Sequence, residues 1–373
     1  MRIAIDAREL QGRATGVGRY LSGVLAAWSE LPAAQSHEFV LCAPAPIDRP
    51  AMSPRVATLV RSGWSHVAGT LWEQLTLPAL VRQARADVLF APAYTGPLLC
   101  PVPMVVAIHD VSFAARPDWF RRREGLRRRI LSRLSARRAA RVLTISQFSK
   151  REIERRLGID AARIEVGYPG TTSLTTPTGR EDPPRTHDEN RVLFVGSLFT
   201  RRHIPALIDG FQRLARQRQD VSLEIVGENR TAPRVDVDRL VATSGVADRI
   251  ALRSYVPDDV LRTLYERARA FVFLSEYEGF GLTPLEALAA GVPIVVLDTP
   301  VAREVYGEAA LYVPRPDAAL IHAALERVLF DEAERARILD ASARLLPRYS
   351  WHACAEHVLS VLLACVTGHK SIP

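Results

Sequence analysis

Two glutamates on either side of a glycine-bearing turn are the residues of this chain best suited to chemistry. Seven residues separate Glu278 from Glu286, and the turn between them contains Gly279 and Gly281. A helix is expected directly after the turn. A free helix N-terminus offers backbone amides to an anion, and each carboxylate accepts hydrogen bonds from hydroxyl groups. The spacing therefore predicts a loop that binds a phosphorylated, hydroxyl-rich ligand.

The same segment also has a purely structural interpretation. Thr283, Pro284 and Glu286 fit the pattern of a capping box, Thr-x-x-Glu, in which Thr283 is the N-cap. A capping role and a ligand contact are compatible for Glu286 if its carboxylate is exposed. No cap explains Glu278, which makes it the stronger candidate for ligand contact.

Length and composition favour a globular protein of two domains. The chain has 373 residues, which is more than one typical core accommodates. Its residues are 48% hydrophobic and 24% charged, as in ordinary globular proteins. The formal charge of +8 favours anionic partners without indicating their kind. Four cysteines follow no metal or disulfide pattern, and no apolar run reaches the ~20 residues of a membrane helix. The N-terminus is expected to form a strand rather than a signal peptide, so we expect a cytoplasmic protein.

Short apolar segments alternate with helical patterns, which predicts parallel, doubly wound α/β sheets. Strands are expected at 2–6, 38–42, 86–91, 102–109, 142–146, 191–196, 222–227, 250–253, 270–274 and 293–297. Helices are expected near 17–31, 72–84, 125–139 and 149–157. A polar linker at 173–190 divides the chain into Rossmann-like domains at 1–172 and 191–348, and a helix at 349–373 returns toward the first domain. Ligands of such sheets bind beyond the carboxyl ends of the strands, so a cleft between the domains is expected.

Residues at other strand ends are further candidates. His109 ends a predicted strand, where it either faces the ligand or is a buried histidine bound to backbone. Gly16 and Gly18 follow the first strand and permit close approach of a phosphate or acceptor, although they do not complete a dinucleotide fingerprint. Ser146 is expected to cap a helix. The Asp-Val-Asp sequence at 236–238 is expected to start a helix rather than to bind a metal.

A basic segment at 121–138 carries arginines among leucines and isoleucine at helical spacing. Two interpretations remain open for this amphipathic helix. It makes peripheral contact with an anionic membrane surface, or it packs its apolar stripe inward and leaves the arginines in solvent. No aromatic residues are interleaved with the charge, so nucleic acid is not expected as a partner.

The glutamate segment resembles a known motif. Its sequence, Glu-Gly-Phe-Gly-Leu-x-Pro-x-Glu-Ala, is similar to the E-x7-E motif of retaining GT-B glycosyltransferases, specifically glycosyltransferase family 4. Further segments match family landmarks in the expected order over nearly the whole chain. These are 1–8, 15–20, 109–110, 144–146, 191–203, 289–295, 303–305 and 309–310.

The resemblance implies roles for individual residues. In the family the first motif glutamate contacts donor-sugar hydroxyls and the second contacts the nucleotide ribose, which here implies Glu278 and Glu286. Arg202 takes the place of the usual lysine beside the diphosphate, and His109 is implied near the reacting centre. The remaining donor-binding residues that the resemblance implies are Gly196, Ser197, Arg201, Tyr255, Val256, Gly279, Phe280, Gly281 and Leu282, together with Gly16 and Gly18.

The resemblance also implies a reaction. A hexosyl unit passes from a nucleotide sugar to a saccharide or lipid-linked acceptor, with retention and with no metal or other cofactor. The segment 108–120 looks most like bacterial mannosyltransferases of O-antigen or exopolysaccharide synthesis, which favours GDP-mannose over a UDP-sugar and a place on the inner face of the cytoplasmic membrane. The alternatives are a GT-B nucleotide-sugar epimerase or hydrolase, a Rossmann oxidoreductase, which the missing fingerprint disfavours, and a non-catalytic binding subunit.

Overall fold

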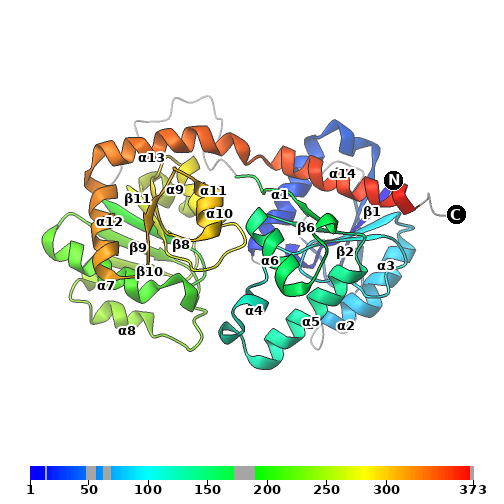
Figure 1. The fold of residues 1–373 in the computed structure, drawn as a ribbon, viewed down its shortest axis with the longest axis horizontal. Coiled ribbons are helices and arrows are strands. Elements are labelled where there is room, and N and C mark those ends of the chain that lie inside the picture. The colour runs from blue at the N-terminus through cyan, green and yellow to red at the C-terminus, as the bar shows by residue number, and fades with distance from the viewer. Residues whose placement is uncertain (13–14, 48–55, 62–68, 172–189, 370–373) are drawn as a thin grey trace. The chain divides into compact units, whose positions relative to one another are not determined.

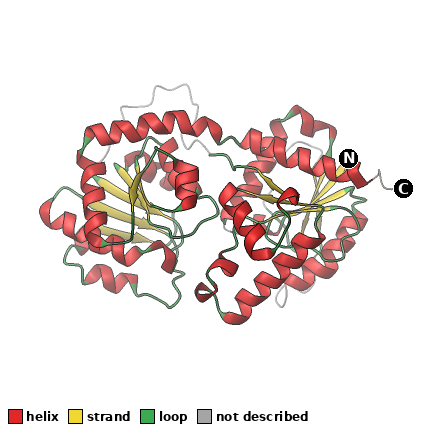
Figure 2. Ribbon diagram, in the orientation of Figure 1, coloured by secondary structure: helices red, strands yellow, loops and turns green. Residues whose placement is uncertain are grey.

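The computed structural model describes residues 1–12, 15–47, 56–61, 69–171 and 190–369. The chain forms two compact units (Figures 1 and 2). Unit 1 comprises residues 1–170 together with 349–373, and unit 2 comprises residues 171–348. Apart from Asn190, the predicted linker at 173–190 lies outside the described residues.

Unit 1 contains a seven-stranded sheet in the order β3-β2-β1-β4-β5-β6-β7, and every strand pair in it is parallel. Its strands are β1 (Arg2–Asp6), β2 (Glu38–Ala43), β3 (Val56–Val60), β4 (Val88–Ala91), β5 (Met104–Ala107), β6 (Arg141–Thr144) and β7 (Ile164–Val166). The two edge strands, β3 and β7, were not predicted. β3 is only half-buried and β7 has three residues, so neither has the continuous apolar run that marks a buried parallel strand.

Helices of unit 1 pack around this sheet (Figure 2). They are α1 (Gly16–Glu30), α2 (Gly69–Leu71), α3 (Leu77–Gln83), α4 (Ser112–Ala115), α5 (Arg122–Arg138), α6 (Gln147–Leu157) and α14 (Trp351–His369), with a π-helical turn at Trp72–Thr76. The C-terminal α14 packs on α1, where the Trp28 indole donates a 2.8 Å hydrogen bond to the Ala355 carbonyl. Ser146 caps α6 as predicted, because its side chain accepts a hydrogen bond from the Ser149 amide at 2.9 Å.

Unit 2 contains a six-stranded sheet, also parallel throughout, in the order β10-β9-β8-β11-β12-β13. Its strands are β8 (Arg191–Val195), β9 (Ser222–Val226), β10 (Ile250–Arg253), β11 (Ala270–Phe273), β12 (Ile294–Leu297) and β13 (Leu311–Val313). Its helices are α7 (Ile204–Gln217), α8 (Val237–Ala242), α9 (Asp258–Arg267), α10 (Leu282–Ala289), α11 (Pro300–Tyr306), α12 (Ala318–Phe330) and α13 (Glu332–Leu345). The three-residue edge strand β13 was not predicted. Asp236 caps α8, which confirms the predicted helix start.

The strand order explains where a ligand would bind in each unit. In unit 2 the order reverses between β8 and β11, which are neighbours in the sheet although they are far apart in sequence. In unit 1 the same reversal lies between β1 and β4. Ligands of open parallel sheets bind outside the carboxyl ends of the strands at such a reversal. The loops that follow β8 and β11 therefore carry the candidate site of unit 2.

Candidate active site

The loop after β8 positions two arginines. Gly196 follows the strand with φ of +142°, and a short 3-10 helix at Thr200–Arg202 leads into α7. A Cβ atom on Gly196 would lie 2.5 Å from Nη1 of Arg202, so only glycine leaves room for the guanidinium here. The Cζ atom of Arg202 lies 4.7 Å from the centre of the Phe273 ring. The Cζ atom of Arg201 lies 4.2 Å from the centre of the Phe199 ring. The aromatic contacts hold both guanidiniums beside the strand ends.

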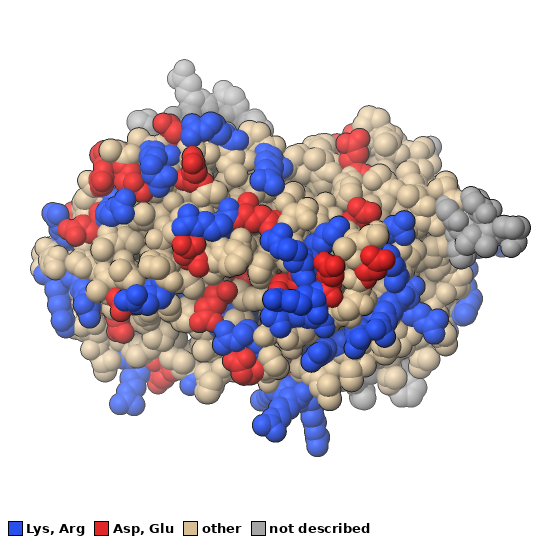
Figure 3. All heavy atoms as spheres, viewed as in Figure 1, with Lys and Arg blue, Asp and Glu red and all other residues tan. Residues whose placement is uncertain are grey.

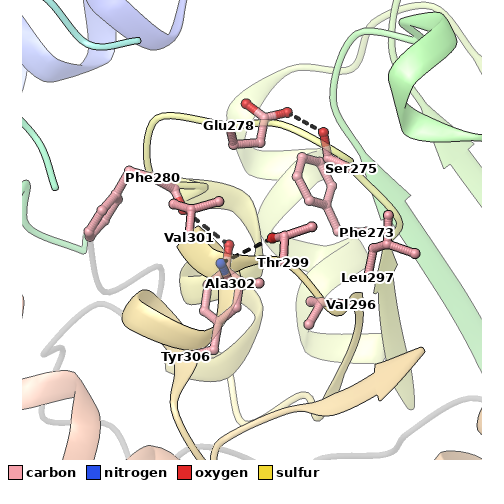
Figure 4. A pocket seen from close by; sticks show the side chains of 10 residues that line it. All are labelled: Phe273, Ser275, Glu278, Phe280, Val296, Leu297, Thr299, Val301, Ala302 and Tyr306. Carbon is pink, nitrogen blue, oxygen red and sulfur yellow. Dashed lines mark hydrogen bonds between the residues drawn. The ribbon is translucent and has the colours of Figure 1, made fainter. Parts of the chain in front are cut away.

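Arg202 is bound to Glu278, which stands in the loop after β11. The Nε and Nη2 atoms of Arg202 donate to Oε1 of Glu278 at 3.0 and 2.8 Å, while Nη1 donates to the Ser197 carbonyl at 2.9 Å. The Ser275 hydroxyl donates to the same Oε1 atom at 2.8 Å (Figure 4). Arg201 adds a second cation, with its Nε 3.9 Å from Oε1. Arg202 and Glu278, which lie 76 positions apart in sequence, thus form one polar cluster at the β8 and β11 ends.

The electrostatics of this cluster keep Glu278 ionised. Burial alone would raise the pKa of its carboxyl, but the charges of Arg202 and Arg201 and the hydrogen bonds from Arg202 and Ser275 together hold that pKa below its ordinary value. About a fifth of the side chain, 19%, remains exposed. Figure 4 shows the second carboxylate oxygen directed away from Ser275. Glu278 is therefore a negatively charged acceptor with an oxygen that the three short hydrogen bonds do not use.

The helix after the turn begins differently from the prediction. Its N-cap is Gly281, with φ of +98°, and no side chain caps the helix, so Thr283 lies inside the first turn and the capping box is wrong. The left-handed backbone of the glycine starts the helix two residues earlier than a Thr283 cap requires. The Tyr306 hydroxyl donates to the Gly281 carbonyl at 2.9 Å and fixes this turn. Pro284 then occupies the first turn, where its missing amide costs no hydrogen bond.

Glu286 lies on α10 and is buried, with 7% of the residue exposed. Its Oε2 atom accepts a hydrogen bond from the Tyr265 hydroxyl of α9 at 3.1 Å. Glu286 therefore bonds to a neighbouring helix and does not cap its own. Contact of Glu286 with a nucleotide ribose stays a prediction.

A small pocket borders Glu278 (Figure 4). Besides Glu278 and Ser275 it is lined by Phe273, Phe280, Val296, Leu297, Thr299, Val301, Ala302 and Tyr306. Thr299 is the N-cap of α11 and accepts a hydrogen bond from the Ala302 amide at 3.2 Å. No role was predicted for Ser275, Thr299 or Tyr306. Ser275 and Thr299 each lie two residues past the end of a buried strand, β11 and β12, which is the signal that could have identified them.

The other predicted donor-binding residues of unit 2 fall on the same turns or near them. Phe280 is buried, Leu282 is the first residue of α10, and Gly279 precedes both. Tyr255 and Val256 follow β10, at the far side of β9 from β8, and Tyr255 is half exposed at 52%. The structure therefore brings most of the predicted set to β8 and β11, and it places Tyr255 and Val256 two strands from β8.

His109, Gly16 and Gly18 belong to unit 1. His109 is buried and its Nε2 atom lies 2.7 Å from the Pro92 carbonyl, so this nitrogen carries the proton and donates. Burial is the main reason that the pKa of His109 lies below its ordinary value, which favours the neutral imidazole. Gly16 opens α1, and the Gly18 amide donates to the Thr15 side chain at 3.0 Å. Roles of these three residues in catalysis or donor binding stay predictions.

Two family models match consecutive parts of the chain. The model described as Glycosyltransferase Family 4 matches residues 15–172, and the model described as Glycosyl transferases group 1 matches residues 176–345. Together they cover both units, including the Arg202–Glu278 cluster. The chain belongs to glycosyltransferase family 4. The family expected from the E-x7-E segment is confirmed.

Two relatives of this glycosyltransferase are named as O-antigen chain mannosyltransferases. The O-antigen chain mannosyltransferase RfbU of Salmonella typhimurium is 27% identical over 68% of either chain. The O-antigen chain mannosyltransferase B of Escherichia coli is 28% identical over 69% of either chain.

Solved structures show the same fold. The Anabaena protein HepE, in complex with UDP and glucose, superposes with a TM-score of 0.73 at 18% identity, over 97% of this chain and 98% of that one. WaaG, a glycosyltransferase involved in lipopolysaccharide biosynthesis, also gives a TM-score of 0.73 at 17% identity, over 97% and 99%. The two parallel sheets and these neighbours establish the predicted GT-B class of fold.

Proposed function

We propose that this glycosyltransferase moves a hexosyl group from a nucleotide sugar to an acceptor hydroxyl with retention at the anomeric carbon. The observation that carries the proposal is the ionised Glu278 carboxylate, which Arg202 holds beyond the carboxyl ends of β8 and β11. A fixed carboxylate beside two guanidiniums provides one group for sugar hydroxyls and two for a diphosphate.

Each of the predicted site residues has a separate task in the proposal. The second oxygen of Glu278 accepts a hydrogen bond from a hydroxyl of the donor sugar. Arg202 and Arg201 stabilise the negative charge that grows on the departing diphosphate. In other enzymes, one hydrogen-bond donor that stabilises such a charge raises kcat by a factor of about 10²–10³. Glu286 accepts a hydrogen bond from the ribose. In the proposal His109 acts near the reacting centre as a neutral imidazole, and its unprotonated Nδ1 is the acceptor because Nε2 donates to the Pro92 carbonyl.

The proposed chemistry is front-face displacement. The acceptor hydroxyl oxygen forms a bond to the anomeric carbon on the face from which the diphosphate leaves. The bond between that carbon and the diphosphate oxygen breaks, its electron pair stays with the diphosphate, and a phosphate oxygen takes the acceptor proton. No protein nucleophile is required, so the protein contributes orientation and charge stabilisation. The arginines supply the positive charge, and no metal has a role.

GDP-mannose is the first donor in this proposal, because both O-antigen relatives are named as mannosyltransferases. A UDP-sugar is the alternative, since the neighbour HepE was solved with UDP and with glucose. The acceptor is a saccharide or lipid-linked saccharide of a bacterial cell-surface polysaccharide. A nucleotide-sugar epimerase or hydrolase remains the rival activity, and it would consume the donor without an acceptor.

A thermal-shift screen with GDP, UDP, GDP-mannose and UDP-glucose tests donor binding. We expect the Tm to rise either with GDP and GDP-mannose or with UDP and UDP-glucose. Within that pair, the nucleotide sugar should raise the Tm more than the bare nucleoside diphosphate. Donor consumption is then followed by chromatography with and without an oligosaccharide acceptor. Acceptor-dependent release of the nucleoside diphosphate supports the transferase, whereas equal consumption without acceptor indicates the rival activity. Failure of every nucleotide to shift the Tm would overturn the proposal.

A further inference from the structure

Helix α5 has an unusual distribution of side chains. Its buried residues are small: Gly125, Ser132, Ser135 and Ala136. Three of its four large apolar residues are exposed, Leu126 at 60%, Ile130 at 47% and Leu134 at 39%, and the fourth, Leu131, is half-buried. The predicted alternative in which an apolar stripe packs inward is therefore wrong. Small side chains let the helix axis lie close to the rest of unit 1, so the Leu and Ile side chains are directed outward.

These three side chains form one stripe. Residues four apart lie on the same face of an α-helix, one turn above the other, and 126, 130 and 134 follow that spacing. At about 100° per residue, Arg123 and Arg137 fall within the same arc and Arg127 at its border. Helix α5 contains eight arginines and one glutamate. The exposed face of α5 thus combines apolar side chains with a dense positive charge, and Figure 3 shows basic side chains gathered where Figure 1 labels α5.

Further exposed leucines lie on segments that are hydrogen-bonded to α5. The Arg127 guanidinium donates to the Thr70 hydroxyl at 3.1 Å, and the adjoining helical turns carry Leu71 (43% exposed) and Leu75 (69%). The Gly96 amide donates to the Ser135 hydroxyl of α5 at 3.1 Å, in the loop that carries Leu99 (78%). Exposed apolar residues of this size therefore concentrate in α5 and its bonded neighbours.

We propose that the outward face of α5, defined by Leu126, Ile130 and Leu134 with Arg123, Arg127 and Arg137, docks on the surface of an anionic lipid bilayer. Leucine and isoleucine enter the boundary between headgroups and acyl chains, while guanidiniums on flexible stems reach the lipid phosphates. Charge complementarity selects this occupant, because juxtamembrane arginines are attracted to anionic lipid whereas an ordinary protein-binding face is depleted in charge at its centre. Among the described residues, no helix is long and apolar enough to cross a membrane, so the contact is peripheral.

The position of this face suits a membrane-held acceptor. The helical turns that carry Leu71 and Leu75 are tied to the carboxyl end of β1, because Arg8 donates to the Gly69 carbonyl at 2.9 Å. Arg8 also binds Asp6, the last residue of β1, at 2.6 Å, and Glu73 of the π-helical turn at 2.5 Å. The docking face therefore adjoins the strand reversal of unit 1, where an acceptor saccharide would bind. This last step rests on the proposed function, but membrane docking itself does not.

Vesicle flotation with the full chain tests the proposal. Phosphatidylcholine vesicles are compared with vesicles that also contain phosphatidylglycerol, at low and high salt. We expect binding only to the anionic vesicles and weaker binding at high salt, because salt screens exposed charges. The two test variants are Leu126→Ser/Ile130→Ser/Leu134→Ser and Arg123→Gln/Arg127→Gln/Arg137→Gln. Each changes exposed side chains, and each should lower the bound fraction on the order of tenfold or more.

The matched control removes three exposed arginines from unit 2, with Arg216→Gln/Arg239→Gln/Arg262→Gln. It has the same net charge as the α5 arginine variant, and we expect less than a twofold effect. Equal losses in both arginine variants would show that only net charge matters and would overturn the proposal. So would the absence of binding to anionic vesicles, or a leucine variant that floats like wild type.

If light scattering shows that wild type is a dimer and the leucine variant a monomer with unchanged flotation, the face binds a second copy instead. The Tm shift by nucleotides is measured in parallel, so that a failure of docking and a failure of donor binding are distinguished.

Discussion

Arg202 directs two nitrogens at a single oxygen of Glu278, with Nε at 3.0 Å and Nη2 at 2.8 Å, and uses its third nitrogen for the Ser197 carbonyl. The arginine therefore connects the turn after β8 to the loop after β11. It fixes the carboxylate and keeps it charged, while leaving the second oxygen outside this set of bonds. The proposed donor site depends on this arrangement.

Replacing Glu278 with Gln should reduce turnover strongly. The amide keeps the shape of the side chain but lacks the negative charge that strengthens the hydrogen bond from a sugar hydroxyl and balances Arg202. We therefore expect kcat/KM to fall on the order of a hundredfold. Steady-state rates with the identified donor measure the loss. Glu276→Gln is the control, because Glu276 lies two residues away and contacts His203 instead. Near-wild-type rates for Glu278→Gln would mean that the assignment of Glu278 is wrong.

The same pair predicts a pH dependence of stability. The pKa of Glu278 is lower in the folded protein than its ordinary value of 4.5. Its contribution is therefore fully present above about pH 4.5 and is lost as the pH falls through the folded pKa. The difference in the free energy of unfolding between wild type and Glu278→Gln should be constant near neutral pH and shrink at acid pH. Urea unfolding of both proteins across this range measures it, and a difference that grows as the pH falls would contradict the ionised state of Glu278.

Arg202 should tolerate lysine better than alanine. Lysine keeps the charge beside the diphosphate but cannot place two nitrogens on Glu278 and a third on Ser197. We expect Arg202→Ala to lower kcat by about 10²–10³ and Arg202→Lys to lower it by much less. A double-mutant cycle with Glu278→Gln should show losses that are smaller than additive, because each single change already breaks the pair. Strict additivity would show that the two side chains act independently.

Gly281 should be intolerant of any side chain. Its φ of +98° disfavours other residues, and a Cβ atom would lie 2.1 Å from the Tyr306 hydroxyl. We expect Gly281→Ala to lower the free energy of unfolding by about 1–3 kcal/mol. Combining it with Tyr306→Phe, which removes that hydroxyl, should recover part of the loss. Gly16→Ala is the control, because nothing lies within 4 Å of a Cβ there. Equal effects of the two glycine changes would contradict this account of the turn.

The buried strands and the placement of Glu278 could be predicted because both depend on local patterns. Continuous apolar runs identified the central strands, and a carboxylate just after β11 had no structural explanation within its own segment. The edge strands β3, β7 and β13 escaped prediction because they are short or only half-buried, so they lack such a run.

Long-range contacts account for the rest. The N-cap at Gly281 depends on Tyr306, which lies 25 residues later, and sequence spacing favoured Thr283 instead. The contact between Arg202 and Glu278 spans 76 residues. Apolar side chains that face outward from a helix have the same sequence spacing as those that face inward. Only the packing of Gly125 and Ser132 against the rest of unit 1 decides between the two orientations of α5.

The role of Glu278 in binding the donor sugar is measured by calorimetric titration of wild type and Glu278→Gln with a nucleoside diphosphate and its sugar conjugate. GDP with GDP-mannose and UDP with UDP-glucose form the two series. We predict that one conjugate binds wild type more tightly than its bare nucleotide, and that Glu278→Gln loses this difference while still binding the nucleotide. A variant that keeps the full gain from the sugar, or a wild-type protein that binds none of the four compounds, would contradict this prediction.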